Sequence, residues 1–369
     1  MTASWTLGLA LLAVTVNRDL QRAARAAGGG RALWALSDSD LVRVLRLGPE
    51  EDAALRRARR SFDPGAVVAS LARDGILHVP CEDPRYPARL AAIYDPPFAL
   101  FATGRHEALE RLHEAPSVAL VGSRAATAEG LWVAAHLARE LARRGAVVVS
   151  GMARGVDAAA HEGALDGGGV TVAVLGTGPD VVYPRRNAAL HRRILERGLV
   201  LSEYWPGTEA APWRFPARNR IVAGLCDAVV VVQAGATSGA LITADFALEA
   251  GRPVLAVPGP PLAPPTAGCN LLLRAGAALC ESVDDIVAEL PDAAWEDAPL
   301  PPRSGLEGLD REVHDRLRRE PLRVDELVAA LGVGPAQVAA AVGRLELAGL
   351  IVRGQGQRLW AAPLMGASC

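Results

Sequence analysis

The chain has 369 residues, 39 basic and 41 acidic side chains, a net charge of −2 and an apolar content of 50%. These values predict two or three globular domains, exclude a disordered chain and give no overall charge that would attract nucleic acid. Every basic residue is arginine, which excludes a conventional P-loop ATPase and Schiff-base chemistry, because both need lysine.

Residues 1–75 are predicted to form a helical N-terminal domain. Apolar residues recur at helical spacing between residues 9 and 24, and a run of three glycines ends the pattern. A second helix is expected from Ser37 or Ser39, which can cap it, and a third, arginine-rich helix over 50–62. We expect a small bundle resembling helix-hairpin-helix or SAM-like domains. An ordinary dimerisation or docking domain is the alternative.

The hydrophobic pattern of residues 76–290 differs from that of the N-terminal region and predicts a Rossmann-like core. Short runs of valine, alanine and leucine end in glycine or serine and alternate with helical stretches. Near-continuous apolar strands indicate a mainly parallel sheet covered on both faces, in a doubly wound α/β fold with ligands at the strand carboxyl ends. The predicted strands are 117–121, 146–149, 170–175, 199–201, 228–232 and 254–257.

The C-terminal region is predicted to be a linker followed by a winged-helix domain. Residues 291–305 are proline-rich and lack a periodic pattern of apolar residues. The pattern of 306–369 predicts three helices and a hairpin. This domain contains eight arginines and eight acidic residues, and its candidate recognition helix offers only Gln337 and Arg344 to a groove. Since duplex binding rests on several phosphate contacts, this balance favours protein docking. The predicted elements are the helices 309–317, 324–331 and 334–348 and the strands 350–352 and 358–360.

Cysteine use and hydropathy indicate a reduced, cytoplasmic chain. The five cysteines are scattered, odd in number and form no C-x-x-C pair or zinc-ligand spacing. The apolar stretch 5–16 is too short to span a bilayer and is interpreted as a core helix. We therefore expect no metal, no cofactor and no membrane partner.

Three loops at predicted strand ends combine glycine with hydroxyl or guanidinium groups. Glycine lets backbone N–H groups approach a phosphate, and a helix N-terminus adds partial positive charge. Each loop alone is equally what a tight strand-to-helix turn requires; together they predict a site for a nucleotide or an extended anionic ligand. A Rossmann dehydrogenase is disfavoured, because the glycines at 176 and 178 lack the third glycine and the helix of that fingerprint. The loops are Gly122-Ser123-Arg124, Gly151-Met152-Ala153-Arg154-Gly155 and Thr237-Ser238-Gly239.

Two arginine clusters strengthen this prediction. On a helix, Arg186, Arg193 and Arg197 share one face. Arginines interleaved with aromatic residues are typical of single-strand binding, where guanidinium groups contact phosphates and rings stack on bases; a solvated helix face is the alternative. The first cluster is Arg185, Arg186, Arg192, Arg193 and Arg197, and the second is Arg214, Arg218 and Arg220 beside Trp213 and Phe215.

Catalytic candidates are weak. Asp157 and His161 have the spacing of an acid–base pair on a helix, but a capping Asp and a core His are the more ordinary interpretation. Ser202 and Glu203 lack the third member of a nucleophile–base–orienter set.

These motifs together resemble the DNA-processing protein family DprA, also called Smf. The resemblance covers roughly residues 75–280 in order. The matching stretches are DPRYPARLAAIYDPPFALFATG at 83–104, VGSR at 121–124, SGMARGVDAAAH at 150–161, VLGTGPDVVYPRRNAAL at 174–190, SE at 202–203, FPARNRIVAGL at 215–225, SGALITADFALEAGRPVLAVPG at 238–259 and GCNLLLRAGA at 268–277.

The resemblance implies a core that binds single-stranded DNA without sequence preference, as a homodimer. It also implies loading of a RecA-type recombinase onto incoming single strands in natural transformation, with displacement of single-strand-binding protein, and a protein that is not generally regarded as an enzyme. The motifs show one departure from the family. Ala217 fills the variable position of FPxRN, where some family members have a basic residue.

The resemblance carries the family's first phosphate-contacting loop over to Gly122, Ser123 and Arg124. Its Ser-Gly loop and its FPxRN motif correspond to further positions in the set below, and Arg185 follows the family's Tyr-Pro pair. The remaining candidates come from the arginine pattern. The full predicted DNA-binding set is Gly122, Ser123, Arg124, Arg154, Arg185, Arg186, Arg218, Asn219, Arg220, Ser238 and Gly239.

Two alternatives remain at this point. The core more distantly resembles nucleotide hydrolases of the lysine-decarboxylase-like group, but residues 233–237 lack the double glycine of their Pro-Gly-Gly-x-Gly-Thr loop. A ligand-sensing transcription regulator would use the winged helix to read an operator.

Overall fold

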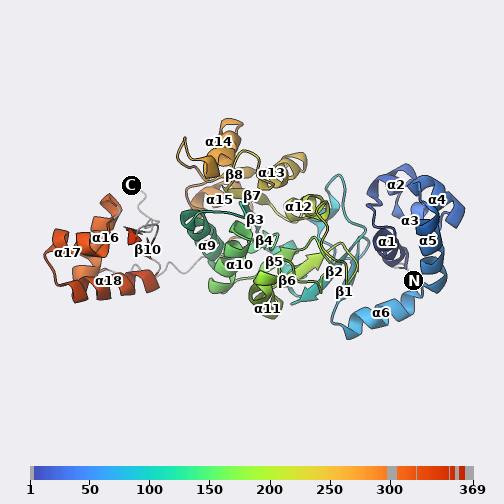
Figure 1. Cartoon of the computed structure of the whole chain (residues 1–369), viewed down its shortest axis with the longest axis horizontal. Helices are drawn as coiled ribbons and strands as arrows, with labels where there is room; N and C mark the ends of the chain where they lie inside the picture. The colour runs from blue at the N-terminus through green and yellow to red at the C-terminus, as the bar shows by residue number, and fades with distance from the viewer. Residues whose placement is uncertain (1–3, 297–305, 321, 349, 354–356, 362–369) are drawn as a thin grey trace. The chain divides into compact units, whose positions relative to one another are not determined.

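The computed structural model describes residues 4–296, 306–320, 322–348, 350–353 and 357–361 (Figure 1). The chain divides into two compact units. One comprises residues 1–126 and 133–297, and the other comprises 298–369 with the short segment 127–132.

The N-terminal region is helical, as predicted, but its helices are shorter and more numerous than expected. Their apolar faces form one cluster around Trp5, Leu12, Leu33, Leu41 and Leu55. The helices are α1 (Ser4–Thr15), α2 (Gln21–Ala26), α3 (Gly30–Ala35), α4 (Asp38–Leu45), α5 (Pro49–Ser61) and α6 (Pro64–Arg73).

The helical pattern of residues 9–24 is interrupted, contrary to the prediction of one run. Asn17 adopts a positive φ of 47°, and the Asp19 carboxylate accepts the backbone N–H of Gln21 at 2.9 Å. Asparagine tolerates this left-handed conformation, and the aspartate offers the backbone a partner outside a helix. Ser37 caps α4 as predicted, by accepting the N–H of Asp40.

A nine-stranded, mostly parallel sheet forms the core and confirms the predicted α/β class. Each of the six predicted strands is present. Three strands were not predicted. Of these, β1 and β2 join the sheet antiparallel, through the pairing of β2 with β6, and β9 pairs in parallel with β8. The order is β1-β2-β6-β5-β4-β3-β7-β8-β9. The strands are β1 (Leu77–Pro80), β2 (Ala99–Gly104), β3 (Ser117–Gly122), β4 (Val147–Ser150), β5 (Thr171–Val174), β6 (Leu199–Ser202), β7 (Ala228–Gln233), β8 (Val254–Ala256) and β9 (Ala278–Leu279).

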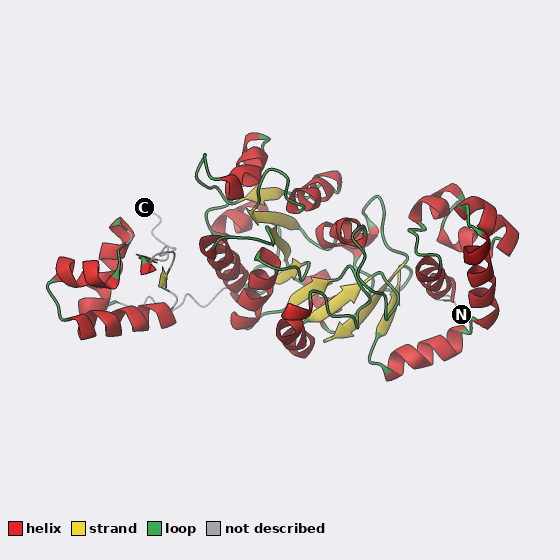
Figure 2. Ribbon diagram, in the orientation of Figure 1, coloured by secondary structure: helices red, strands yellow, loops and turns green. Residues whose placement is uncertain are grey.

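Helices cover both faces of this sheet (Figure 2). Alternate residues of one strand enter different clusters: Val147 and Val149 pack with α12 and α13, whereas Val148 packs with α9 and α10. This alternation explains why the strands are apolar throughout. The helices are α7 (Ala88–Ala91), α8 (Ala108–Glu114), α9 (Ala128–Arg143), α10 (Val156–Asp166), α11 (Ala188–Arg197), α12 (Arg214–Gly224), α13 (Ala240–Glu249), α14 (Ala267–Arg274) and α15 (Val283–Glu289), with 3-10 turns at Arg185–Asn187 and Pro264–Thr266.

The first residues of the predicted linker belong to the core. Trp295 packs against the cluster beneath α9 and α15, and its indole N–H donates to the Leu290 carbonyl at 3.1 Å. The Glu296 carboxylate accepts from Arg111 at 2.9 Å. These contacts correct the predicted start of the linker, whose later residues, 297–305, lie outside the described residues.

The C-terminal unit has the three predicted helices and a two-stranded hairpin. They are α16 (Gly308–Arg319), α17 (Val324–Leu331), α18 (Pro335–Leu347), β10 (Ile351–Arg353) and β11 (Leu359–Ala361). The turn between the two predicted strands of this hairpin includes residues 354–356, which lie outside the described residues. Throughout the described ranges, no single helix is both long and apolar enough to cross a bilayer, although the bent pair α17–α18 passes the length and composition test together.

Candidate nucleic-acid interface

The chain reverses direction across the sheet at β3. From this strand, β4, β5 and β6 extend to one side and β7, β8 and β9 to the other. In an open α/β sheet, ligands bind in the crevice at the carboxyl ends of the strands where the order reverses. The loops that follow β3, β4 and β7 meet there and line a cleft of about 500 Å³.

This cleft brings together most of the predicted residues. The N-termini of α10 and α13 adjoin the loops that line it, so partial positive charge is directed toward it. Thr237 and Asp157 also line it, although neither belonged to the predicted set. The predicted residues that line the cleft are Gly122, Ser123, Arg124, Arg218, Asn219, Ser238 and Gly239.

Packing alone requires two glycines of these loops. A Cβ on Gly122 would lie 2.6 Å from Cγ2 of Val156, and one on Gly155 would lie 2.1 Å from the Ser123 carbonyl oxygen. Gly155 also has a positive φ of 80°. The loops after β3 and β4 are therefore in direct contact, which leaves the phosphate-binding role of Gly122 a prediction.

At the rim of the cleft, the guanidinium of Arg124 contacts the ring of Phe215, which in turn contacts the ring of Tyr183. The Arg124 guanidinium carbon lies 5.6 Å from the centre of the Phe215 ring, and the Tyr183 ring lies 5.1 Å from Phe215 on a tilted plane. Arg124 and Tyr183 are exposed, and Phe215 is half-buried. The sequence indicated Arg124 and Phe215. Tyr183 was not among the predicted residues, although it belongs to the Tyr-Pro pair that precedes Arg185.

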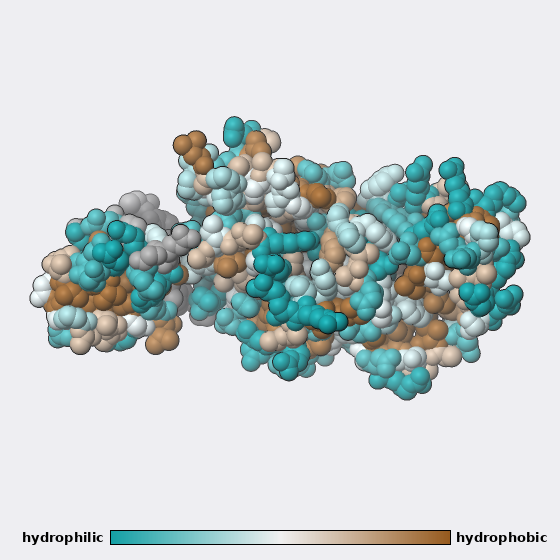
Figure 3. Space-filling view, viewed as in Figure 1, coloured by the Kyte–Doolittle hydropathy of each residue, from teal (hydrophilic) through white to brown (hydrophobic). Residues whose placement is uncertain are grey.

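Three predicted arginines lie outside the cleft lining. Arg154 is exposed in the loop before α10, and Arg185 and Arg186 are exposed in the 3-10 turn before α11. That turn begins two residues after Tyr183, so Arg185 and Arg186 follow the aromatic rim closely along the chain. Figure 3 shows a band of strongly hydrophilic residues crossing the middle of the visible face of this core.

Arg218 lines the cleft but is only 3% exposed. Its Nη1 donates to the carbonyl oxygens of Gly151, at 2.7 Å, and of Val174. Burial lowers the pKa of Arg218 to about 10, and burial raises the pKa of Asp157 against the opposing effect of Arg218.

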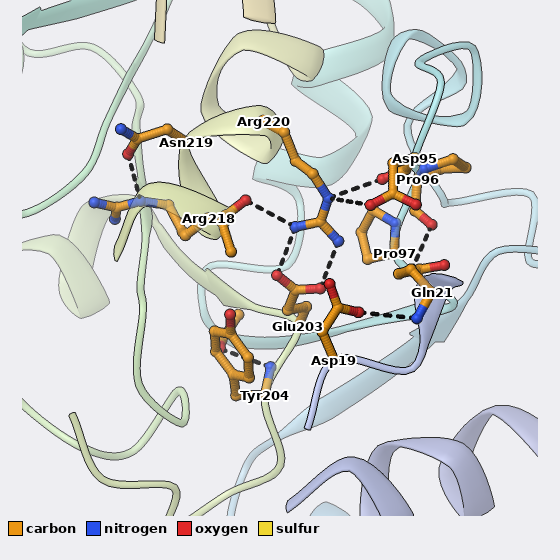
Figure 4. A network of polar contacts seen from close by, with 12 residues as sticks. Asp19, Gln21, Asp95, Pro96, Pro97, Glu203, Tyr204, Arg218, Asn219 and Arg220 are labelled. Atoms are coloured by element: carbon orange, nitrogen blue, oxygen red, sulfur yellow. Dashed lines mark hydrogen bonds and ion pairs between the residues drawn. The ribbon is translucent and has the colours of Figure 1, made fainter. Parts of the chain in front are cut away.

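Arg220 does not belong to the cleft, which corrects its place in the predicted set. Its guanidinium forms a two-pronged ion pair with Glu203, with both N···O distances 2.7 Å, and Nε donates to the Asp95 carbonyl at 2.9 Å. Burial opposes its charge, but Glu203 and Asp95 outweigh burial and raise its pKa above the ordinary value. Figure 4 shows Arg218 and Arg220 leaving α12 in different directions.

The structure does not form the acid–base pair considered for Asp157 and His161. Asp157 accepts the Ala153 N–H at 3.2 Å, and His161 is fully buried with Nδ1 2.7 Å from the Thr171 hydroxyl. Burial lowers the pKa of His161 to about 3, so the ring is neutral. This agrees with the core-histidine interpretation. Among residues that the structure describes, no group of three His, Cys, Asp or Glu side chains could hold a metal ion.

Comparisons with protein families match most of the chain. Residues 78–291 match the family described as DNA recombination-mediator protein A, and residues 296–357 match the DprA winged helix domain. Protein Smf of Escherichia coli is 36% identical over 333 residues, covering 87% of each chain. The DNA processing protein DprA of Bacillus subtilis is 40% identical over 242 residues, covering 65% of this chain and 80% of the relative.

Two solved structures share this fold. DprA from Streptococcus pneumoniae superposes with a TM-score of 0.63 at 37% identity, covering 76% of this chain and 96% of its own. DNA processing protein A from Helicobacter pylori, described for its single-stranded DNA binding mode, has a TM-score of 0.51 at 32% identity, covering 56% of this chain and 93% of its own. With family matches over both the core and the winged helix, the chain belongs to the DprA/Smf family of DNA-processing proteins.

Proposed function

We propose that the cleft binds single-stranded DNA without sequence preference. The observation that carries this proposal is the rim, where an exposed guanidinium and two aromatic rings follow one another beside backbone donors at two helix N-termini. Guanidinium groups attract phosphates, and aromatic rings stack on any base, so this arrangement suits a single strand more than a duplex. The binding mode described for the H. pylori relative supports the same ligand.

The winged helix supports a role other than tight duplex binding. Among the residues of this domain that the structure describes, five arginines form ion pairs, and these include Arg344 of α18, whose Nη2 lies 2.6 Å from Asp310. The acidic partner beside each of these arginines repels phosphate, so the domain presents little net positive charge to a duplex. We infer that this domain docks a protein.

Fluorescence anisotropy with labelled oligo-dT and a matched duplex, each at two salt concentrations, tests the proposal. We expect tighter binding to the single strand, with a log–log salt slope of about −0.7 for each neutralised phosphate. Equal or stronger duplex binding would instead favour a winged-helix regulator. Release of free base from a nucleotide would favour the nucleotide hydrolase and contradict a non-enzymatic role.

We further propose that the protein acts as a cytoplasmic homodimer that loads a RecA-type recombinase onto single strands covered by single-strand-binding protein. Membership of the DprA/Smf family supports this step. The test is the rate at which recombinase filaments form on coated single strands, with and without the protein. An unchanged rate at saturating protein would exclude the loading role and leave strand binding in place.

A further inference from the structure

We propose that Arg218 is a positioning residue that acts through Asp157, and that it does not neutralise a phosphate of the bound strand. The inference rests on the proposed function, because one of its tests measures the binding of single-stranded DNA in the cleft. It divides the charged residues of the cleft into Arg124, which meets the strand, and a buried pair that holds the loops in place.

The hydrogen bonds of Arg218 join separate parts of the sheet edge. Nη1 donates to the carbonyls of Gly151, which follows β4, and Val174, which ends β5. Nε donates to the Oδ1 of Asn219 at 3.3 Å. One guanidinium therefore connects the ends of two neighbouring strands to α12, and these bonds occupy donors that a phosphate would need.

Arg218 and Asp157 lie on the same side of Gly151. A Cβ on Gly151 would lie 2.4 Å from Nη2 of Arg218 and 2.7 Å from Oδ2 of Asp157. Both charged groups thus approach the same point above this glycine. Asp157 accepts the Ala153 N–H and Arg218 donates to the Gly151 carbonyl, so each of the two side chains holds the loop that leads from β4 into α10.

The charges of this pair cancel. A carboxylate against a guanidinium sums to zero, and both side chains are buried, with 3% of Arg218 and 7% of Asp157 exposed. Arg124 is exposed and has a ring as its contact. The salt slope of strand binding counts neutralised phosphates. Arg124 should therefore contribute to the slope and Arg218 should not.

The experiment measures oligo-dT affinity and its salt slope for the full chain and four variants. Arg124→Gln should lower the affinity and reduce the slope by about 0.7. Arg218→Gln should lower the affinity at least tenfold with the slope unchanged, because it removes the main cation near the buried Asp157 carboxylate and the donor to the Gly151 carbonyl. Adding Asp157→Asn to Arg218→Gln should recover most of the loss. Arg274→Gln, which removes an exposed charge at the end of α14, is the control and should stay within twofold.

Two results would overturn the inference: a slope reduced by Arg218→Gln as much as by Arg124→Gln, or no recovery in the double variant. Thermal unfolding of the same variants, and of Asp157→Asn alone to complete the cycle, keeps the test informative if Arg218→Gln folds poorly. Destabilisation that Asp157→Asn relieves supports the positioning role, and additive losses contradict it. A wild-type chain that binds no single strand at any salt concentration would overturn the proposed function, and the unfolding cycle would then decide the role of the pair.

Discussion

At the scale of single residues, Gly155 shows how closely the loops of the cleft are packed. Gly155→Ala should lower the free energy of unfolding by more than about 3 kcal/mol, because backbone strain at this φ and ψ costs about 1–3 kcal/mol and the new Cβ would also meet the Ser123 carbonyl. Gly168 has the same φ of 80°, but a Cβ added there would meet nothing within 4 Å, so Gly168→Ala should cost only about 1–2 kcal/mol. Urea denaturation compares them, and equal losses would show that the two loops do not approach closely.

Phe215 tests the aromatic part of the proposed interface. Stacking on a base is worth about 1–3 kcal/mol, so Phe215→Ala should weaken oligo-dT binding roughly 5- to 150-fold. The salt slope should stay constant, since no charge is removed. Tyr94→Ala is the matched control, because Tyr94 is 82% exposed and does not line the cleft. Anisotropy titrations measure both, and similar losses in the two variants would argue against a specific stacking site.

At the scale of elements, α12 separates two roles that its sequence cannot distinguish. Successive helical residues turn by about 100°, so Arg218 and Arg220 leave the helix about 200° apart. Arg218 faces the cleft, whereas Arg220 meets Glu203, and Arg214 donates to Asn17 of the helical N-terminal region at 2.7 Å. The pattern FPARNR indicated arginines of one kind, because the helix face that each residue occupies depends on tertiary packing.

The Glu203–Arg220 pair should contribute strongly to stability. Glu203→Gln leaves a buried guanidinium without its main counter-charge, and breaking a buried pair in this way costs about 3–5 kcal/mol. Asp166→Asn removes the partner of Arg193 in an exposed pair and should change stability by less than about 1 kcal/mol. Chemical denaturation distinguishes them. A loss from Glu203→Gln no larger than from Asp166→Asn would mean that Arg220 finds other partners or water.

At the scale of the whole molecule, the sequence predicted the parallel part of the sheet well and its antiparallel edge poorly. The parallel strands are apolar runs that end in glycine or serine, a pattern that burial on both faces requires. The strands β1 and β2 are separated by residues 81–98, without the short turn that signals a hairpin, and β2 also pairs with the distant β6. The cleft was predictable because strand ends of a doubly wound sheet converge, whereas the partner of each buried arginine was not.

Buried histidines should make the stability of the core depend on pH. The pKa of His161 is lowered to about 3 and that of His78 to about 4, mainly by burial, whereas the unfolded value is about 6.5. Between these values the unfolded chain therefore binds more protons than the folded chain. The stability that the neutral histidines contribute is fully present above about pH 6.5 and is lost as the pH decreases toward 4.

Each histidine should contribute a slope of up to about 1.4 kcal/mol per pH unit within this window. His161→Asn keeps a donor for the Thr171 hydroxyl and removes the titrating ring, because Thr171 donates its own proton to the Val148 carbonyl at 2.8 Å and must accept from residue 161. The variant should therefore lose about one proton of slope between pH 6.5 and 4.5 in urea denaturation. If this variant kept the full slope, the acid sensitivity of the core would have to come from groups other than His161.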